Sequence, residues 1–179
     1  MGARGLEGRA ASPTAGVIDG QGVKTTESGG VRGDDAGKGI KGGKRHIVTD
    51  MPGLMPGLVV HAASAQDRDG APAMLKSIRA RWPWSRHVLA DGGYAGPRLK
   101  GAPRGVGERT LEIIKRSDTA KGVEAPPRGG GVERTFAWLG RCRRLAKDWE
   151  KSIASAEAWV FIAHIRPLTR RLARYCYVS

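Results

Sequence analysis

The chain is poor in cysteine and lacks long apolar runs. Its 179 residues include two cysteines, Cys142 and Cys176, and no CxxC pair. This pattern excludes a small disulfide-stapled scaffold and favours a reducing compartment, so we expect a cytoplasmic protein. No apolar run approaches the roughly 18 residues that favour a membrane-spanning helix, and the N-terminus has no apolar segment typical of a secretory leader. The sequence therefore predicts neither a membrane span nor secretion.

Motifs for several common chemistries are also missing. The four histidines (His46, His61, His87 and His164) form no HExxH motif and no Cys/His zinc spacing, so each is expected on a strand surface or in the core. The GKGIKG segment at 37–42 matches a dinucleotide-binding fingerprint, but no strand precedes it and no helix follows. Serine and cysteine nucleophile signatures are absent as well.

Acidic residues are scarce relative to basic ones. The chain has 31 Lys and Arg against 17 Asp and Glu, which gives a net charge of +14 and a pI near 10.6. Such a surplus favours a polyanionic partner, because each neutralised phosphate releases condensed counterions. A basic protein without such a partner is the alternative. Glycine is abundant, with 27 residues concentrated partly in 29–43 and 129–131, where we expect irregular backbone.

Hydrophobic patterning predicts an α/β protein. Residues 1–15 show no period and are expected to form a disordered leader, and residues 25–43 a loop rich in Gly and Lys. Short apolar runs predict five strands, near residues 17–18, 45–49, 58–61, 87–90 and 111–115. Helical spacing predicts three helices, between Asp67 and Pro83, over 132–147 and over 153–175. This order favours a single α/β domain over residues 16–175.

Three carboxylates stand at or just after short apolar runs. Asp19 lies in GVIDGQGVKT, Asp91 in HVLADGGYAG and Glu133 in GVERTFAWLGRCRRL. Each has an ordinary explanation, because an Asp at a strand end often forms a turn and a Glu in a first helical turn complements the helix dipole. Together, two Asp at neighbouring strand tips and a Glu on a packed helix are a pattern that can bind divalent cations through hard oxygen ligands.

Basic residues are dense in the 38–45 loop and around Glu133. Such runs are often only a solvated face, but here they would flank the three carboxylates and position phosphates. The residues expected to contact DNA are Lys24, Lys38, Lys41, Lys44, Arg45, Arg134, Arg141, Arg143, Arg144 and Lys147. The tryptophans Trp138, Trp149 and Trp159 are expected mainly in the core, with stacking on a DNA base as the alternative.

Seven segments together resemble one protein family. They are GVIDGQGVKTTESGG, DAGKGIKGGKRHIVTD, LVVHAASAQDRDGAP, LADGGYAGP, LEIIKRSD, VERTFAWLGRCRRLAKDWE and SAEAW. The chain is similar to the catalytic part of DDE transposases of bacterial insertion sequences, in the IS-five branch. The resemblance runs from about Pro13 to Leu172 and rests on the combination of segments rather than on any single one.

The resemblance implies an RNase H-like fold, with a mixed five-stranded sheet flanked by helices. It implies that Asp19, Asp91 and Glu133 form the catalytic and metal-binding triad and hold two Mg²⁺ ions, for which Mn²⁺ substitutes. The implied activity is cleavage of double-stranded DNA at the ends of an insertion sequence and transfer of those ends to target DNA. A homo-oligomer on DNA, associated with the bacterial nucleoid and not with a membrane, is implied too.

The chain departs from the family pattern in three places. A helical DNA-binding region usually precedes the first strand, but this chain begins almost at that strand, so we expect an N-terminal truncation. Gly20 and Gly22 replace two serines, and glycines at 129–131 lead into Glu133, with Arg128 beside the position of an expected Arg. The glycines are expected to loosen the placement of Glu133. These departures keep two alternatives open, an inactive remnant that only binds DNA and an RNase H-like nuclease.

Overall fold

A mixed β-sheet with helices on both faces forms the protein. The computed structural model describes residues 3–27, 30–83, 85–95, 110–114 and 130–176. The strands are β1 (Ala15–Lys24), β2 (Gly33–Asp35), β3 (Ile40–Thr49), β4 (Gly57–Ala62), β5 (His87–Asp91) and β6 (Thr110–Ile114). The helices are α1 (Ala3–Leu6), α2 (Asp67–Arg81), α4 (Gly130–Gly140) and α5 (Ile153–Cys176), with short 3₁₀ turns η1 (Gly92–Tyr94) and η2 (Arg143–Leu145). The predicted α/β class is confirmed.

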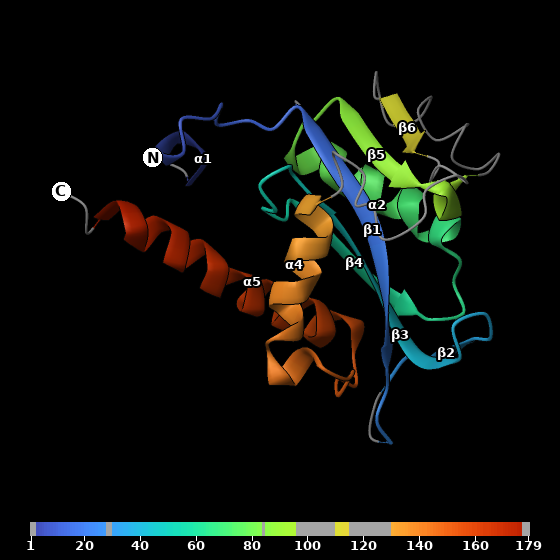
Figure 1. Ribbon diagram of the computed structural model, residues 1–179. Coiled ribbons are helices and arrows are strands. Elements are labelled where there is room, and N and C mark those ends of the chain that lie inside the picture. The colour runs from blue at the N-terminus through green and yellow to red at the C-terminus, as the bar shows by residue number, and fades with distance from the viewer. Residues whose placement is uncertain (1–2, 28–29, 84, 96–109, 115–129, 177–179) are drawn as a thin grey trace, which may run out of the picture.

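Strand β1 lies in the middle of the sheet. It pairs antiparallel with β3 along Val17 to Lys24, and parallel with β5 along Ala15 to Ile18. The far edge of β3 pairs antiparallel with both β2 and β4, and β6 extends the sheet parallel to β5. An antiparallel meander is thus joined to two parallel strands, and the carboxyl ends of β1 and β5 point the same way (Figure 1).

The sheet has six strands in the described residues, not the five expected. The additional strand β2 lies in the segment predicted to be a loop, because Gly33–Asp35 folds back on the start of β3 in a short hairpin. Gly39 in its turn has φ of 61°, a left-handed conformation that glycine adopts without steric cost. The expected loop over 25–43 was therefore wrong for its second half.

Alternating side chains place two apolar layers on opposite faces of the sheet. Val17 and Leu89 pack with α4 and α5, and their neighbours Ile18 and Val88 pack with α2. This alternation follows from the two-residue period of a strand. Figure 1 shows the result, with α2 on one face of the sheet and α4 and α5 on the other. The three helices thus cover both faces, as predicted for this class.

Two further expectations about the helices need correction or addition. The helix expected over 132–147 ends at Gly140, and η2 follows it, because glycine weakens a helix and Leu145 instead turns into the core. In the segment expected to be a disordered leader, the structure has the short helix α1, and Arg4 forms an ion pair with Asp50. The expected helix over 153–175 is confirmed as α5.

Candidate functional site

Two of the three predicted carboxylates lie side by side on parallel strands. Ile18 of β1 is in register with Ala90 of β5, so Asp19 and Asp91 follow at the next position of each strand. The backbone N–H of Gly20 donates to Asp19 Oδ1 at 2.7 Å, and Asp91 Oδ1 accepts from the N–H of Gly93 at 3.0 Å. Asp19 is half-buried and Asp91 is exposed at the end of its strand. The sheet topology therefore brings together residues that are far apart in the sequence.

Glu133 approaches the pair from a different element. It lies in the first turn of α4, a helix that packs against β1 and β3, and its side chain is exposed. The pKa of Asp19 is raised to about 6, first by burial and then by the negative charges of Asp91, Glu133 and Asp67, against the hydrogen bond from Gly20. Asp19 is thus close enough to Asp91 and to Glu133 for their negative charges to affect its ionisation.

The docking of α4 depends on one of the unusual glycines. Gly131 is buried, and a Cβ at this position would come within 2.7 Å of the carbonyl oxygen of Met51 and 2.8 Å of that of Asp50. The hydroxyl of Thr135 lies 2.9 Å from the carbonyl oxygens of both Gly53 and Gly131 and donates to one of them at a time. At Gly131, glycine is therefore a packing requirement that holds the turn carrying Glu133 close to the sheet.

The donor chemistry of this site fits a divalent cation. Carboxylate oxygens are the hard ligands that Mg²⁺ prefers, and a bound cation would offset the burial and the neighbouring negative charges that raise the pKa of Asp19. In the part of the chain that the structure describes, no three Asp, Glu, His or Cys side chains lie close enough to surround one ion. Asp91 and Glu133 are exposed, and Asp19 is half-buried.

A fourth carboxylate, Asp67, was missed as a site residue by the sequence analysis. It begins α2, and the pattern around it predicted only a helix start. The carboxylate of Asp67 lies close to two glycines of the site. A Cβ on Gly93 would lie 3.2 Å from Asp67 Oδ2 and 3.1 Å from Asp91 Oδ1. A Cβ on Gly20 would lie 3.0 Å from Asp67 Oδ1. Nothing in the local sequence distinguishes this Asp from an ordinary residue of a first helical turn.

Lys44 and His46 surround Asp67 from β3. The Lys44 ammonium lies 3.2 Å from Asp67 Oδ1 and 3.4 Å from Asp35 Oδ2, and it donates to the carbonyl oxygen of Ala65. His46 Nε2 lies 3.9 Å from Asp67 Oδ1. Asp67 therefore contributes negative charge beside Asp19, and the buried Lys44 balances much of that charge.

His46 is part of the core beneath the site. Its Nδ1 lies 2.8 Å from the hydroxyl of Tyr94, and its ring stacks on His61 at 4.5 Å between centroids. Burial, followed by the charge of His61, lowers the pKa of His46 to about 3, so the ring is neutral at pH 7. A Cβ on Gly20 would come within 2.9 Å of this ring, which gives the serine-to-glycine departure at Gly20 a steric reason.

The fold buries two of the residues that were expected to contact DNA. Lys44 and Arg45 are 3% and 4% exposed, because β3 is covered by β1 and β4 on its edges and by helices on its faces. Lys44 is bound to Asp67 as described, and Arg45 donates to the carbonyl oxygen of Leu145 at 2.9 Å. For these two residues the expectation of phosphate contact was wrong.

The remaining basic residues stay exposed, although some already have partners. The exposed set is Lys24, Lys38, Lys41, Arg134, Arg141, Arg143, Arg144 and Lys147. Arg144 pairs with Glu150 and lies over the ring of Trp159, and Arg134 donates to the carbonyl oxygen of Met51. Their contact with DNA stays a prediction. Trp149, expected in the core, is 42% exposed.

The fold and the comparisons with known proteins agree. A meander joined to parallel strands, with helices on both faces, is an RNase H-like fold. The family model of the transposase DDE domain matches residues 10–167, and the chain belongs to this family.

One solved structure has a similar fold. A chain in the cryo-EM structure of the simian T-cell lymphotropic virus intasome in complex with PP2A regulatory subunit B56 gamma matches with a TM-score of 0.53 and 14% identity. The match covers 87% of this chain and 49% of that one, so this chain spans about half the length of that relative. No curated protein matches significantly in sequence. Within the described residues, no helix is both long and apolar enough to cross a bilayer.

Proposed function

We propose that this chain is the catalytic domain of an insertion-sequence transposase of the IS-five branch. It cleaves double-stranded DNA at the element ends and transfers the freed 3′ ends to target DNA. Asp19, Asp91 and Glu133 act as the catalytic carboxylates, and the protein works on DNA as a homo-oligomer. Membership of the transposase DDE domain family supports the proposal.

One observation carries the assignment of the site. Asp19 and Asp91 follow paired positions of the parallel strands β1 and β5, and α4, which carries Glu133, packs against β1, although 71 and 41 residues separate the three along the chain. Burial, and after it the charges of Asp91 and Glu133, raises the pKa of Asp19 to about 6. A fold gains nothing in stability from carboxylates that repel one another, so such a cluster is a marker of function. It is also the arrangement that a transposase needs beside a phosphodiester.

The three carboxylates are the groups of this chain that would hold two divalent cations. When bound there, divalent cations would supply Lewis-acid charge that stabilises the reacting phosphate. The pKa of Asp19 is raised to about 6, so near and below that pH a cation would compete with a proton on this residue. Asp67 adds to the negative charge, and Lys44 keeps that addition small.

In the first step, water attacks phosphorus and the bond to the 3′ oxygen of the element end breaks. In the second step, this 3′ hydroxyl attacks a phosphodiester of target DNA, so that a new P–O bond forms as one in the target breaks. The exposed basic residues around α4 hold the flanking phosphates, which positions the strands for both displacements.

The test is a cleavage and joining assay. The full chain is incubated with duplexes that carry the terminal repeats of its own insertion sequence, in Mg²⁺ or Mn²⁺, and nicked and joined products are resolved on denaturing gels. We expect Asp19→Ala, Asp91→Ala and Glu133→Ala each to abolish both products while retaining DNA binding. Asp34→Ala, which removes an exposed acid on β2, is the matched control and is expected to leave both products unchanged.

The outcomes separate this function from its alternatives. DNA binding by a folded chain without cleavage in either metal would indicate an inactive remnant. Cleavage without joining of 3′ ends to a second duplex would indicate a nuclease. Equal activity of the wild type and the three alanine variants would refute the proposed site.

A further inference from the structure

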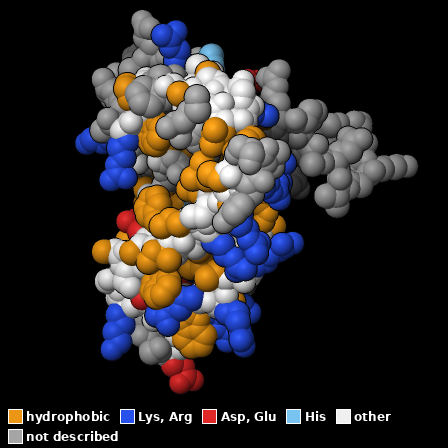
Figure 2. Space-filling model, turned by 90° about the vertical axis from the view of Figure 1, so that its left-hand side faces the viewer, with side chains coloured by type: hydrophobic (Ala, Val, Ile, Leu, Met, Phe, Trp, Pro, Cys, Tyr) orange, Lys and Arg blue, Asp and Glu red, His pale blue; other side chains and the backbone are white. Residues whose placement is uncertain are grey.

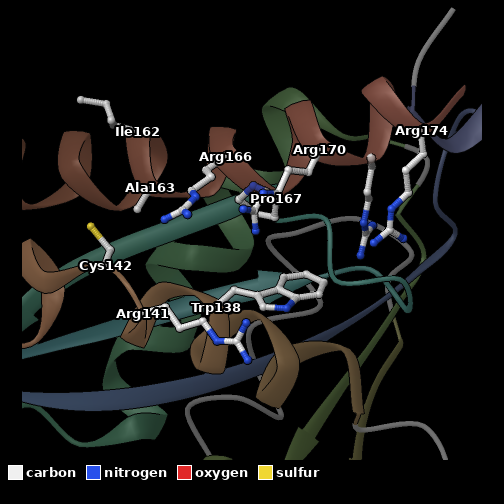
Figure 3. A pocket seen from close by; sticks show the side chains of 10 residues that line it. Trp138, Arg141, Cys142, Ile162, Ala163, Arg166, Pro167, Arg170 and Arg174 are labelled. Atoms are coloured by element: carbon white, nitrogen blue, oxygen red, sulfur yellow. The ribbon is translucent and has the colours of Figure 1, made fainter. Parts of the chain in front are cut away.

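A groove lined by arginines runs between the end of α4 and α5. It has a volume of about 770 Å³, and its lining includes Trp138 together with Arg141, Arg166, Arg170, Arg171 and Arg174. No acidic residue is part of this lining. Figure 3 shows side chains from α5 on one side of the groove, and Trp138 of α4 with Arg141 and Cys142, which follow α4, on the other. On the face of the molecule that Figure 2 presents, Lys and Arg side chains gather beside apolar ones.

One arginine forms part of the wall of the groove. Arg171 donates to the carbonyl oxygen of Pro52 at 2.6 Å, and its guanidinium lies 5.1 Å from the ring centroid of Trp138. Its bonds are therefore used to join α5 to α4 and to the turn before β4. Arg171 holds the groove in shape rather than offering its charge to a ligand.

The other arginines offer their charge to solvent. Arg141, Arg166, Arg170 and Arg174 are exposed, and among the described residues none of them forms an ion pair with an acidic side chain. Four cationic groups along one groove repel one another at low ionic strength, and an anion bound between them removes this cost. The groove is therefore built for a ligand that carries several negative charges.

The spacing of the arginines favours an extended anion. Arg166, Arg170 and Arg174 are four residues apart, slightly more than one turn, so they share one face of α5 at intervals of about 6 Å. One strand of duplex DNA presents a phosphate about every 3.4 Å along its axis, so the row spans several successive phosphates. A small anion would need convergent donors, whereas these follow a line.

The groove also leads toward the catalytic helix turn. A second, adjoining hollow of about 310 Å³ shares Trp138, Arg171 and Arg174 with it and continues to Arg134. Arg134 is the neighbour of Glu133 in the first turn of α4. The one acid that lines this hollow, Glu7, lies 3.9 Å from Arg9. Basic side chains of α5 thus continue from the groove to Arg134, the residue beside Glu133.

We propose, on the basis of the function proposed above, that this arginine groove binds the phosphate backbone of the duplex that flanks the reacting phosphate. Arg166, Arg170 and Arg174 contact phosphates of one strand from α5, and Arg141, just after α4, contacts them from the other side of the groove. These contacts are to the backbone and do not read bases, so they hold element ends and target DNA alike.

The test compares two variants that remove equal charge. Arg166→Gln/Arg170→Gln alters the groove, and Arg68→Gln/Arg86→Gln removes two exposed arginines from α2 and the segment after it, on the α2 side of the sheet. Binding of the full chain to a fluorescent duplex is measured by anisotropy in EDTA over a range of salt concentrations, so that no metal-dependent step contributes. One arm uses terminal-repeat DNA and the other an unrelated duplex of the same length.

We expect the groove variant to lose about two units from the slope of log K against log salt, because each lost phosphate contact removes roughly 0.9. At 0.1 M salt this corresponds to a loss of affinity on the order of tens-fold, with the control variant close to wild type. Thermal unfolding is expected to be the same for all three proteins, because the replaced side chains are exposed. If the groove variant loses affinity for both duplexes, the groove binds duplex DNA of any sequence. If it loses affinity only for the terminal-repeat duplex, the groove binds element ends.

Three results would overturn the proposal. The groove and control variants could bind both duplexes equally, the wild type could bind neither duplex, or the groove variant could lose binding only to a polyglutamate peptide, which would assign the groove to an acidic protein. Failure of the proposed function is distinguishable from these results. A wild type that binds through the groove but never cleaves in Mg²⁺ or Mn²⁺ would refute the catalysis and leave the groove in place.

Discussion

The ammonium group of Lys44 lies 3.2 Å from the carboxylate of Asp67, beneath the strand that carries Asp19. Lys44 is 3% exposed, which is rare for a lysine and is possible because Asp67, Asp35 and the carbonyl oxygen of Ala65 all surround it. This pair connects β3 to the start of α2. It also compensates the fourth acidic group of the candidate site.

Lys44→Met is expected to destabilise the fold, because it leaves Asp67 and Asp35 without their cation. Breaking a buried pair from one side typically costs about 3–5 kcal/mol, and the partial exposure of Asp67 places this case at about 2–4 kcal/mol. Urea unfolding measures the change. Lys41→Met is the control, since its exposed pair with Asp34 at 3.9 Å contributes less than about 1 kcal/mol. Equal losses in the two variants would contradict the role given to Lys44.

Gly131→Ala is expected to be harmful, whereas Gly130→Ala is expected to be tolerated. A Cβ at position 131 would contact the backbone at Asp50 and Met51, whereas a Cβ at position 130 meets open space. Overpacking of this kind costs about 1–3 kcal/mol, and the change at 130 is expected to stay within about 1 kcal/mol. Chemical unfolding gives both values, and the assay of strand joining shows whether Glu133 is displaced. Similar effects of the two substitutions would show that Gly131 is not a packing requirement.

The stability of the fold is expected to decrease as the pH falls from 6.5 toward 4. Burial, followed by the charge of Arg171, lowers the pKa of His164 to about 4, and its Nε2 accepts from the N–H of Met55. The unfolded chain binds a proton near pH 6.5, so the contribution of neutral His164 is complete above that pH and is lost as the pH falls through the window down to 4.

Thermal unfolding between pH 4.5 and pH 8 tests this dependence. His164→Gln is expected to flatten the decrease, and His87→Gln, at an exposed position, is expected to retain it. Because the pKa of Asp19 is raised, protonation of Asp19 increases the stability of the fold as the pH falls from 6 to 4, opposite to the effect of His164. The contribution of His164 is therefore obtained by comparing variants and not from the wild-type curve alone. A His164→Gln curve parallel to the wild type would contradict the assignment.

Asp19→Asn is expected to raise the melting temperature at pH 8 in EDTA. Above pH 6 the wild type keeps an ionised carboxylate in a half-buried position beside other acids, and the amide removes this charge. Mg²⁺ is expected to stabilise the wild type and not the variant, because a cation that binds the native state shifts the unfolding equilibrium. Differential scanning calorimetry with and without Mg²⁺ provides the measurement. A variant stabilised by Mg²⁺ as much as the wild type would place the cation elsewhere.

Local patterns were sufficient to find most of the elements. The apolar runs at 45–49, 58–61 and 87–90 lie within β3, β4 and β5. Strands that face an apolar layer on each side of a sheet can be recognised as short apolar runs in the local sequence. The long helix α5 was found because its apolar residues repeat at helical spacing over many turns. The end of α4 at Gly140 was missed, since the apolar pattern continues through Leu145 in a different conformation.

The candidate site was found only in part for a related reason. Asp19, Asp91 and Glu133 stand in recognisable segments, whereas Asp67 looks like any acid at a helix start. Lys44 and Arg45 looked like surface residues of a basic loop, and only the pairing of β3 with β1 and β4 buries them. The strand pairing that decides their burial involves residues distant in sequence.

By itself, the sequence determined the α/β class, the strong positive charge and the three segments that carry the carboxylates, because each depends on residues that are neighbours along the chain. The tertiary structure alone decided which basic residues face solvent, where Asp67 lies, and that Arg141, just after α4, and arginines of α5 line one groove. These features depend on side chains brought together across dozens of residues, and such contacts leave no periodic signal in the local sequence.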